Sequence, residues 1–159
     1  MKYVLTGGAG HISKPLAETL LSAGHDVTVI GRNAENLKSL TDKGAKAAIG
    51  NVEETDFLKQ AFTGADAVYT MIPPQYAAGS LEDYRRIAAN YAEAVKATGV
   101  KYVVNLSSIG AHLPEGCGPV SGLFQSEEEL NKLEDINVLH LRPGFFYINF
   151  FGNIGMVKG

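Results

Sequence analysis

The sequence of 159 residues contains no tryptophan, a single cysteine and no long run of apolar residues. One cysteine excludes an internal disulfide and fits a reducing compartment. Cys117 also has no matched histidine partner that would make it a nucleophile. Four scattered histidines suggest no metal site. No apolar stretch approaches the roughly 20 residues that cross a bilayer, so we expect no membrane partner.

Charge of either sign is also sparse. The chain carries 14 Lys and Arg against 17 Asp and Glu, a net charge of −3. It lacks the basic run that follows a nucleic-acid backbone, so nucleic acid is not an expected partner. A strand-like pattern begins at Lys2, which leaves no room for a signal peptide. Together with the lone cysteine, this predicts a cytoplasmic location.

The sequence does contain a regular alternation of strand-like and helix-like segments. Strands are expected at residues 2–6, 26–30, 45–49, 67–71, 101–106 and 137–141. Helices are expected to end near residue 23 and to cover 33–43, 55–62, 81–98 and 126–133, with 107–122 as a looser segment. This alternation predicts an α/β fold, a doubly wound parallel sheet of Rossmann type. Right-handed crossovers favour the strand order 3-2-1-4-5-6, in a single domain over residues 1–159.

Particular side chains refine the expected helices. Asn33 and Thr55 suit the N-cap position, where a side-chain oxygen accepts from a free backbone N–H. A period of 3.6 residues predicts one buried stripe in each of two helices. The stripes comprise Ile12, Leu16, Leu20 and Leu21 in the first helix, and Leu81, Tyr84, Ala88, Tyr91 and Val95 in the fourth.

Residues 3–13 read Tyr-Val-Leu-Thr-Gly-Gly-Ala-Gly-His-Ile-Ser, a strand followed by a glycine turn and a helix start. This arrangement is typical of sites for the pyrophosphate of a dinucleotide. The first glycine allows a tight turn, Gly10 lets phosphate approach the backbone, and the helix start offers free N–H groups. The alternative is a glycine turn without a ligand. The predicted cofactor-binding residues here are Gly7, Ala9, Gly10, His11, Ile12 and Ser13, where Ser13 replaces the third glycine.

Further candidates follow the other strands, because ligands of doubly wound sheets bind at the carboxyl ends of the strands. The residues predicted to contact a cofactor there are Asn51, Val52, Met71, Ile72, Pro73, Ser107 and Pro143.

The second expected strand ends in Ile30-Gly31-Arg32-Asn33. A fold that prefers NAD usually places a carboxylate here for the ribose 2′-hydroxyl, whereas an arginine suits a 2′-phosphate. Arg32 therefore predicts NADP(H) in preference to NAD(H). The alternative is a solvated arginine at the edge of the sheet.

With these residues in place, the chain resembles the NmrA-like family of atypical short-chain dehydrogenases. Four segments carry the resemblance: residues 6–13, residues 30–33, Asn105-Leu106-Ser107-Ser108, and Leu141-Arg142-Pro143-Gly144-Phe145-Phe146 with Asn149. The resemblance implies an NADPH-dependent reductase of quinone, azo-dye or triphenylmethane type. The family's Gly-Asp pair after the third strand stands here as Gly50-Asn51.

Two departures from the family of dehydrogenases bear on catalysis. Residues 109–130 contain neither Tyr nor Lys, so the usual Tyr-x-x-x-Lys proton relay is absent. Ser107 and Ser108 remain as catalytic candidates, because they could donate to a developing oxyanion, or they form a turn. The tyrosines nearest the expected cleft are Tyr76 and Tyr147. The chain also ends shortly after the Pro-Gly-Phe-Phe segment, so we expect it to lack the family's substrate lid.

Three functions remain open. The first is hydride transfer from NADPH to a quinone-like or azo acceptor, a small-molecule substrate. The second is a redox-sensing regulator that binds NADP and a protein partner without turnover. The third is a protein similar to sugar-nucleotide epimerases, against which the missing Tyr and Lys count.

Overall fold

The computed structural model describes residues 1–73 and 80–154, and within them six parallel strands form one sheet in the order β3-β2-β1-β4-β5-β6. The strands are β1 (Lys2–Leu5), β2 (Asp26–Gly31), β3 (Lys46–Ile49), β4 (Ala67–Met71), β5 (Tyr102–Leu106) and β6 (Asn137–Leu141). The predicted Rossmann-like fold and its strand order are therefore confirmed. Pro74 and Tyr76 lie outside the described residues.

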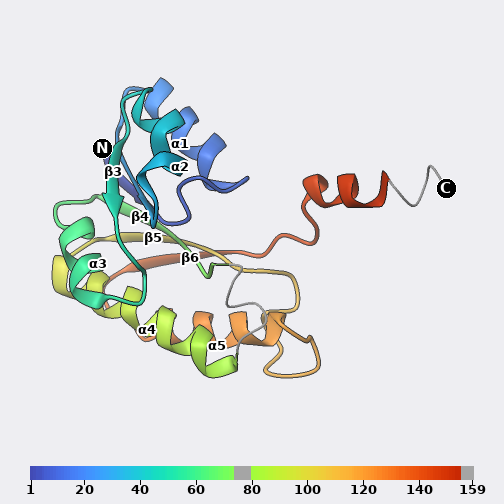
Figure 1. The fold of residues 1–159 in the computed structure, drawn as a ribbon. Helices are drawn as coiled ribbons and strands as arrows, with labels where there is room; N and C mark the ends of the chain where they lie inside the picture. The colour runs from blue at the N-terminus through green and yellow to red at the C-terminus, as the bar shows by residue number, and fades with distance from the viewer. Residues whose placement is uncertain (74–79, 155–159) are drawn as a thin grey trace.

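The helices cover both faces of the sheet (Figure 1). Helices α1 (Ser13–Ser22) and α2 (Ala34–Thr41) pack on one face, and α3 (Thr55–Phe62), α4 (Leu81–Thr98) and α5 (Val120–Leu130) on the other. Each face has its own apolar core, centred on Val29 and Leu37 beneath α1 and α2 and on Phe62 and Tyr91 beneath α3 and α4. No helix in the described part of the chain is long and apolar enough to span a bilayer.

Strand β1 lies at the point where the strand order reverses. It pairs with β2 on one side, Leu5 opposite Val29, and with β4 on the other, Leu5 opposite Tyr69. Helix α1, which comes after β1, and helix α4, which comes after β4, lie on opposite faces of the sheet. In sheets of this kind, such a reversal places a crevice at the carboxyl ends of the strands.

The structure confirms one predicted cap and corrects the other. Asn33 Oδ1 accepts a hydrogen bond of 2.8 Å from the backbone N–H of Glu35 at the start of α2. At α3 the cap position belongs to Glu54, which makes no side-chain cap bond. Thr55 is the first helical residue, and its hydroxyl donates to Asn90 Oδ1 on α4 instead. Competition from a neighbouring helix explains the difference.

The predicted stripe of the fourth helix is right except at its first residue. In the first helix the buried residues are Ser13 and Ala17, and the predicted Leu16, Leu20 and Leu21 are only partly buried. Ile12 precedes α1 and is exposed, and Leu81, the first residue of α4, is also exposed. Both residues stand at the N-terminal start of a helix, at the carboxyl edge of the sheet. Tyr84, Ala88, Tyr91 and Val95 are buried as expected.

The fifth helix begins six residues earlier than the predicted start at 126. Helix α5 runs from Val120 to Leu130, and Pro119 precedes it in a helical conformation. Gly122 was interpreted as part of a loop, but it is a helical residue whose lack of a side chain admits the ring of Tyr84. A Cβ at Gly122 would lie 2.5 Å from Tyr84 Cγ. The glycine is therefore required by packing between α4 and α5.

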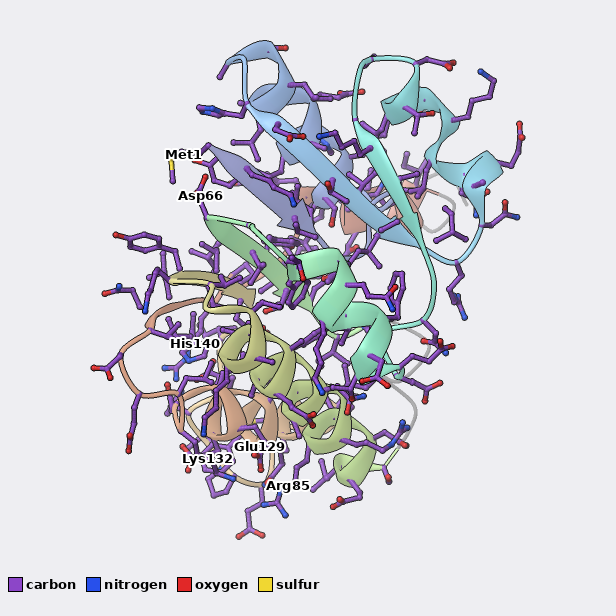
Figure 2. The ribbon with its side chains drawn as sticks, turned by 90° about the vertical axis from the view of Figure 1, so that its left-hand side faces the viewer. Met1, Asp66, Arg85, Glu129, Lys132 and His140 are labelled. Atoms are coloured by element: carbon purple, nitrogen blue, oxygen red, sulfur yellow. The ribbon has the colours of Figure 1, made fainter. Side chains whose placement is uncertain are left out.

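Helices α4 and α5 also meet through charged side chains at the surface. Glu129 Oε1 lies 3.3 Å from Arg85 Nε and 2.7 Å from Lys132 Nζ, and Figure 2 shows the three residues together on this side of the molecule. Exposed pairs of this kind contribute about 0–1 kcal/mol each. The apolar contacts beneath them therefore carry most of the stability of this helix pair.

Candidate functional site

The glycine turn after β1 has the shape that the sequence predicts. Gly7 has φ of +66°, a left-handed conformation that favours glycine. A Cβ at Gly8 would lie 2.9 Å from Val29 Cβ, so this glycine is required for packing. A Cβ at Gly10 would approach only the carbonyl of Gly7, at 3.1 Å. The space around Gly10 is otherwise open, as a phosphate that contacts the backbone requires.

Ser13 joins the start of α1 to the strand. It is 2% exposed, and its hydroxyl donates a hydrogen bond of 2.9 Å to the carbonyl of Thr6. The bond connects the start of the helix to the end of the strand, at the position where a third glycine usually allows the two to pack closely. It also holds the N-terminus of α1 beneath the glycine turn, where the backbone N–H of Lys14 donates to the carbonyl of Gly10 over 2.9 Å. The positive end of the helix dipole at this point favours an anion.

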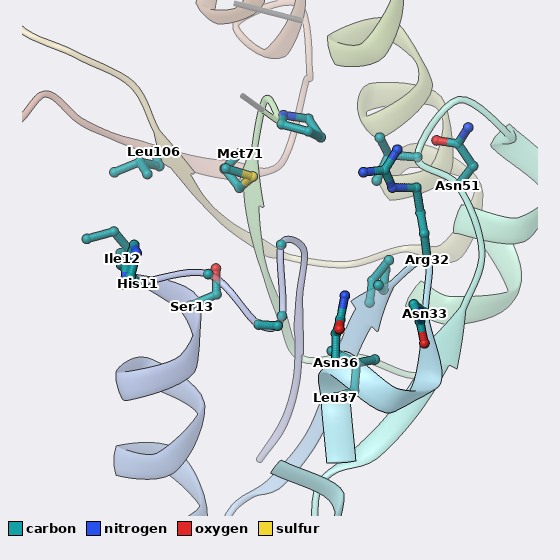
Figure 3. Close-up of a pocket in the computed structure, with 18 of the residues that line it drawn as sticks. His11, Ile12, Ser13, Arg32, Asn33, Asn36, Leu37, Asn51, Met71 and Leu106 are labelled. Carbon is teal, nitrogen blue, oxygen red and sulfur yellow. The ribbon is translucent and has the colours of Figure 1, made fainter. Parts of the chain in front are cut away.

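A cavity of about 700 Å³ opens at the carboxyl edge of β1, β2 and β4 (Figure 3). It is large enough for a nucleotide, since ligand pockets usually measure roughly 300–1,000 Å³. Eleven of the fourteen predicted cofactor residues line it: Gly7, Ala9, Gly10, His11, Ile12, Ser13, Arg32, Asn51, Val52, Met71 and Pro73. Gly8, Asn36 and Leu37 line it as well, and the sequence interpretation did not select them.

Arg32 lies on the side of the cavity opposite His11, Ile12 and Ser13 (Figure 3). It is exposed, and its guanidinium makes no ion pair or hydrogen bond with any residue in 1–73 or 80–154. Asn36 lines the same end. A guanidinium without a protein partner beside an open cavity is suited to bind a phosphate.

Asn51 is held in place by the residue two positions later. Its Nδ2 donates to Glu53 Oε2 over 2.9 Å, and its Oδ1 accepts from the backbone N–H of Glu53 at 3.3 Å. Glu53 in turn pairs with Arg86 of α4 at 2.8 Å. The amide that replaces the family's aspartate is therefore fixed at the cavity wall, next to the buried Val52.

The other three predicted residues, Ile72, Ser107 and Pro143, line a second cavity of about 370 Å³. It adjoins the first, because Met71, Leu106, Phe146 and Asn149 line both. Ser108 also lies in its wall. The structure thus brings the strand-end residues together in two connected spaces, the larger beside the glycine turn and the smaller beyond β4 and β5.

Ser107 is hydrogen-bonded to a residue that the sequence interpretation missed. Its hydroxyl donates to Glu127 of α5, and Arg142 Nε donates to the same carboxylate over 2.9 Å. Burial alone would raise the pKa of Glu127, but the bonds from Arg142 and Ser107 outweigh it and lower the pKa. Glu127 is therefore ionised at neutral pH and holds the proton of Ser107 away from the cavity.

A second missed residue is Tyr84, which lines the smaller cavity from α4. The sequence did not indicate a role for Tyr84 in the site, because a residue in a regular apolar stripe is predicted only to pack in the core. Tyr147, one of the two tyrosines expected near the cleft, is 87% exposed and lines neither cavity. It lies in the 3₁₀ helix Tyr147–Asn153, which extends away from the sheet (Figure 1).

A family model described as NAD(P)H-binding matches residues 7–147, which is most of the chain. The chain belongs to this NAD(P)H-binding family. The matched span contains the glycine turn, Arg32 and both cavities' strand-end residues. The open space at Gly10 and the unpaired Arg32 agree with a nucleotide cofactor on physical grounds as well.

The solved structures of two reductases have the same fold as this chain. Triphenylmethane reductase from Citrobacter sp., crystallised with NADP(H), is 22% identical with a TM-score of 0.80, over 99% of this chain and 54% of that one. The NADPH-dependent quinone oxidoreductase of Escherichia coli, with NADPH, is 18% identical with a TM-score of 0.81, over 97% and 53%. At these identities the two neighbours show a shared fold.

One curated relative is an epimerase, whereas the two structural neighbours are reductases. The UDP-glucose 4-epimerase of Streptomyces lividans is 32% identical over 63 residues, which are 40% of this chain and 19% of the epimerase. The chain thus spans about a fifth of this relative and about half of each reductase. The shared part supports an oxidoreductase-like NAD(P)H-binding fold.

Proposed function

We propose that this protein is an NADPH-dependent reductase that transfers hydride to a quinone-like or azo acceptor. The observation that carries the proposal is the pair of connected cavities. The larger has the glycine turn at one end and the unpaired Arg32 at the other, as a dinucleotide with a 2′-phosphate requires. The smaller lies beside it and is mostly apolar, with Ser107, Ser108, Tyr84 and Asn149 as its polar members.

The residues of the site bind and orient rather than exchange protons. When bound, NADPH supplies the hydride, and with one proton from solvent a quinone becomes a hydroquinone. Gly7 and Gly10 admit the pyrophosphate, and the N-terminus of α1 stabilises its charge. Arg32 binds the 2′-phosphate. Met71 and Leu106, which line both cavities, lie where the two spaces adjoin and would help to orient the cofactor toward the acceptor.

A conjugated acceptor suits this site better than a simple ketone. Residues 109–130 supply no Tyr-x-x-x-Lys relay, so nothing at that position delivers a proton in step with the hydride. A quinone tolerates this order, because its ring spreads the charge over two oxygens until solvent protonates it. A ketone forms a localised alkoxide and benefits far more from a positioned acid.

The test measures NADPH consumption by the protein with a panel of quinones, azo dyes and simple ketones. We expect turnover with quinones or azo dyes and little with ketones. Efficient ketone reduction would contradict the proposal. Tight NADPH binding without turnover of any acceptor would also contradict it and would favour the redox-sensing regulator.

A further inference from the structure

We propose that Tyr84 is a catalytic hydrogen-bond donor, whose phenol hydroxyl binds the acceptor oxygen that gains charge during reduction. The inference rests on the proposed reductase function and names the acceptor as a carbonyl-bearing aromatic ring of quinone type. It places the donor on α4, outside the segment after β5 where a Tyr-x-x-x-Lys pair would lie.

The first argument is the state of the Tyr84 side chain. The residue is only 4% exposed, and it lines the smaller cavity. Its hydroxyl makes no hydrogen bond with any residue in 1–73 or 80–154. A buried tyrosine usually has a partner for its hydroxyl. Among the described residues, the hydroxyls buried from solvent without a partner are those of Tyr69 and Ser126, so the unbonded hydroxyl of Tyr84 keeps access to the cavity. Tyr91, two stripe positions further along α4, forms such a bond by donating to the carbonyl of Met71 over 2.8 Å. Tyr84 lacks such a bond, and the cavity is the space from which a ligand could supply it.

The second argument is that the Tyr84 ring is fixed. It packs against the backbone of Gly122 on α5, so closely that a Cβ at that position would lie 2.5 Å from Tyr84 Cδ2. A ring held between two helices keeps its hydroxyl in one place. Donors positioned before the reaction lose little free energy to reorganisation when charge develops.

The third argument is that the neighbouring serine is not available as a donor. The proton of Ser107 points to Glu127, which Arg142 keeps ionised. Ser108 is half-buried in the same wall and makes no side-chain hydrogen bond within the described ranges. Tyr84 and Ser108 are therefore the two hydroxyls that can donate into this cavity, and Tyr84 is the more rigidly held.

The environment of Tyr84 suits a donor rather than a base. Burial raises the pKa of its hydroxyl, so the phenol stays protonated at neutral pH. It stabilises the developing oxyanion by a hydrogen bond and leaves net protonation to solvent. This differs from a tyrosine whose pKa a neighbouring lysine lowers, which gives up its proton during the reaction.

The test compares Tyr84→Phe with the unmodified protein in steady-state reduction of naphthoquinone by NADPH. We expect kcat to fall about a hundredfold, the usual loss for one oxyanion donor, while the KM for NADPH is unchanged. The substitution keeps the ring against Gly122, so the thermal unfolding midpoint should change little. Tyr102→Phe, an exposed tyrosine at the opposite end of β5, is the matched control and should keep full activity.

A second measurement separates this inference from the proposed function. Calorimetry measures naphthoquinone binding to the protein saturated with NADP⁺, where no hydride is available. We expect Tyr84→Phe to weaken this binding about three- to tenfold, the effect of one neutral hydrogen bond. If the unmodified protein shows no turnover, the reductase proposal fails, while weaker quinone binding by the variant still supports Tyr84 as donor. Unchanged kcat in an active protein, or no difference in quinone binding, would overturn the inference.

Discussion

At the scale of single residues, the three glycines after β1 have three different duties. Gly7 adopts a left-handed conformation, Gly8 makes room for Val29, and Gly10 faces open space apart from the carbonyl of Gly7. Only the third duty concerns a ligand. The sequence pattern treats the three glycines alike. The structure shows that two of them are needed for folding and that the third leaves space for a ligand.

This separation gives a prediction for Gly10→Val. A branched side chain would occupy the space where pyrophosphate approaches the backbone, so NADPH binding should be lost while the circular dichroism spectrum remains that of the unmodified protein. Gly152→Val, at an open position in the C-terminal 3₁₀ helix, should bind normally. In contrast, Gly8→Val should impair folding itself. Normal NADPH binding by Gly10→Val would mean that the phosphate does not bind at this turn.

At the scale of helices and strands, the local signals of the sequence predicted most of the fold. Glycine turns, the Asn33 cap and apolar periods each depend on a few neighbouring residues, and the strand ends that they define place Arg32 and Asn51 at the cavity. The start of α5 was not predictable in the same way, because the need for a glycine at position 122 comes from a contact with Tyr84 on another helix.

The site residues that the sequence did not reveal were missed for the same reason, which is that tertiary packing selects them. Glu127 is an unremarkable member of a run of acidic residues, 127–129, and only tertiary packing separates it from its neighbours. It is buried between Ser107 and Arg142, while Glu128 is exposed. Which residue of such a run turns inward depends on the helix's rotation against the sheet, and a single sequence does not encode that plainly.

The buried carboxylate predicts a pH-dependent contribution to stability. The pKa of Glu127 is lowered in the folded protein, so the native state binds its proton more weakly than the unfolded chain does. The contribution is therefore fully present above the unfolded pKa of about 4.3 and is lost as the pH falls through the lower folded pKa. At neutral pH, Glu127→Gln should reduce the free energy of unfolding by about 1–3 kcal/mol.

Urea unfolding of Glu127→Gln and the unmodified protein, at several pH values from neutral to acidic, measures this difference. We expect it to shrink on acidification, since the native carboxylate is then protonated as well. The exposed neighbour Glu128→Gln is the matched control and should match the unmodified protein throughout. A difference for Glu127→Gln that stays constant with pH would show that ionisation of this group does not stabilise the fold.

At the scale of the whole molecule, the fold brings the predicted cofactor-binding residues together at one edge of the sheet. The glycine turn, the N-terminus of α1 and Arg32 come from separate parts of the chain and meet around one cavity of about 700 Å³. The smaller cavity, with Tyr84 and Ser108, lies next to it. This arrangement supports the proposal that the chain binds a cofactor and an acceptor on adjoining surfaces.

The most direct test of the account is a calorimetric titration of the protein with NADPH and, separately, with NADH. We expect one NADPH per chain, bound about tenfold or more tightly than NADH, because a charge-assisted contact to the 2′-phosphate is worth about 1.5–3 kcal/mol. Arg32→Ala should remove this preference while leaving NADH affinity nearly unchanged, and Arg85→Ala, on the distant α4–α5 surface, should keep it. Equal affinity of the unmodified protein for NADPH and NADH would contradict the account.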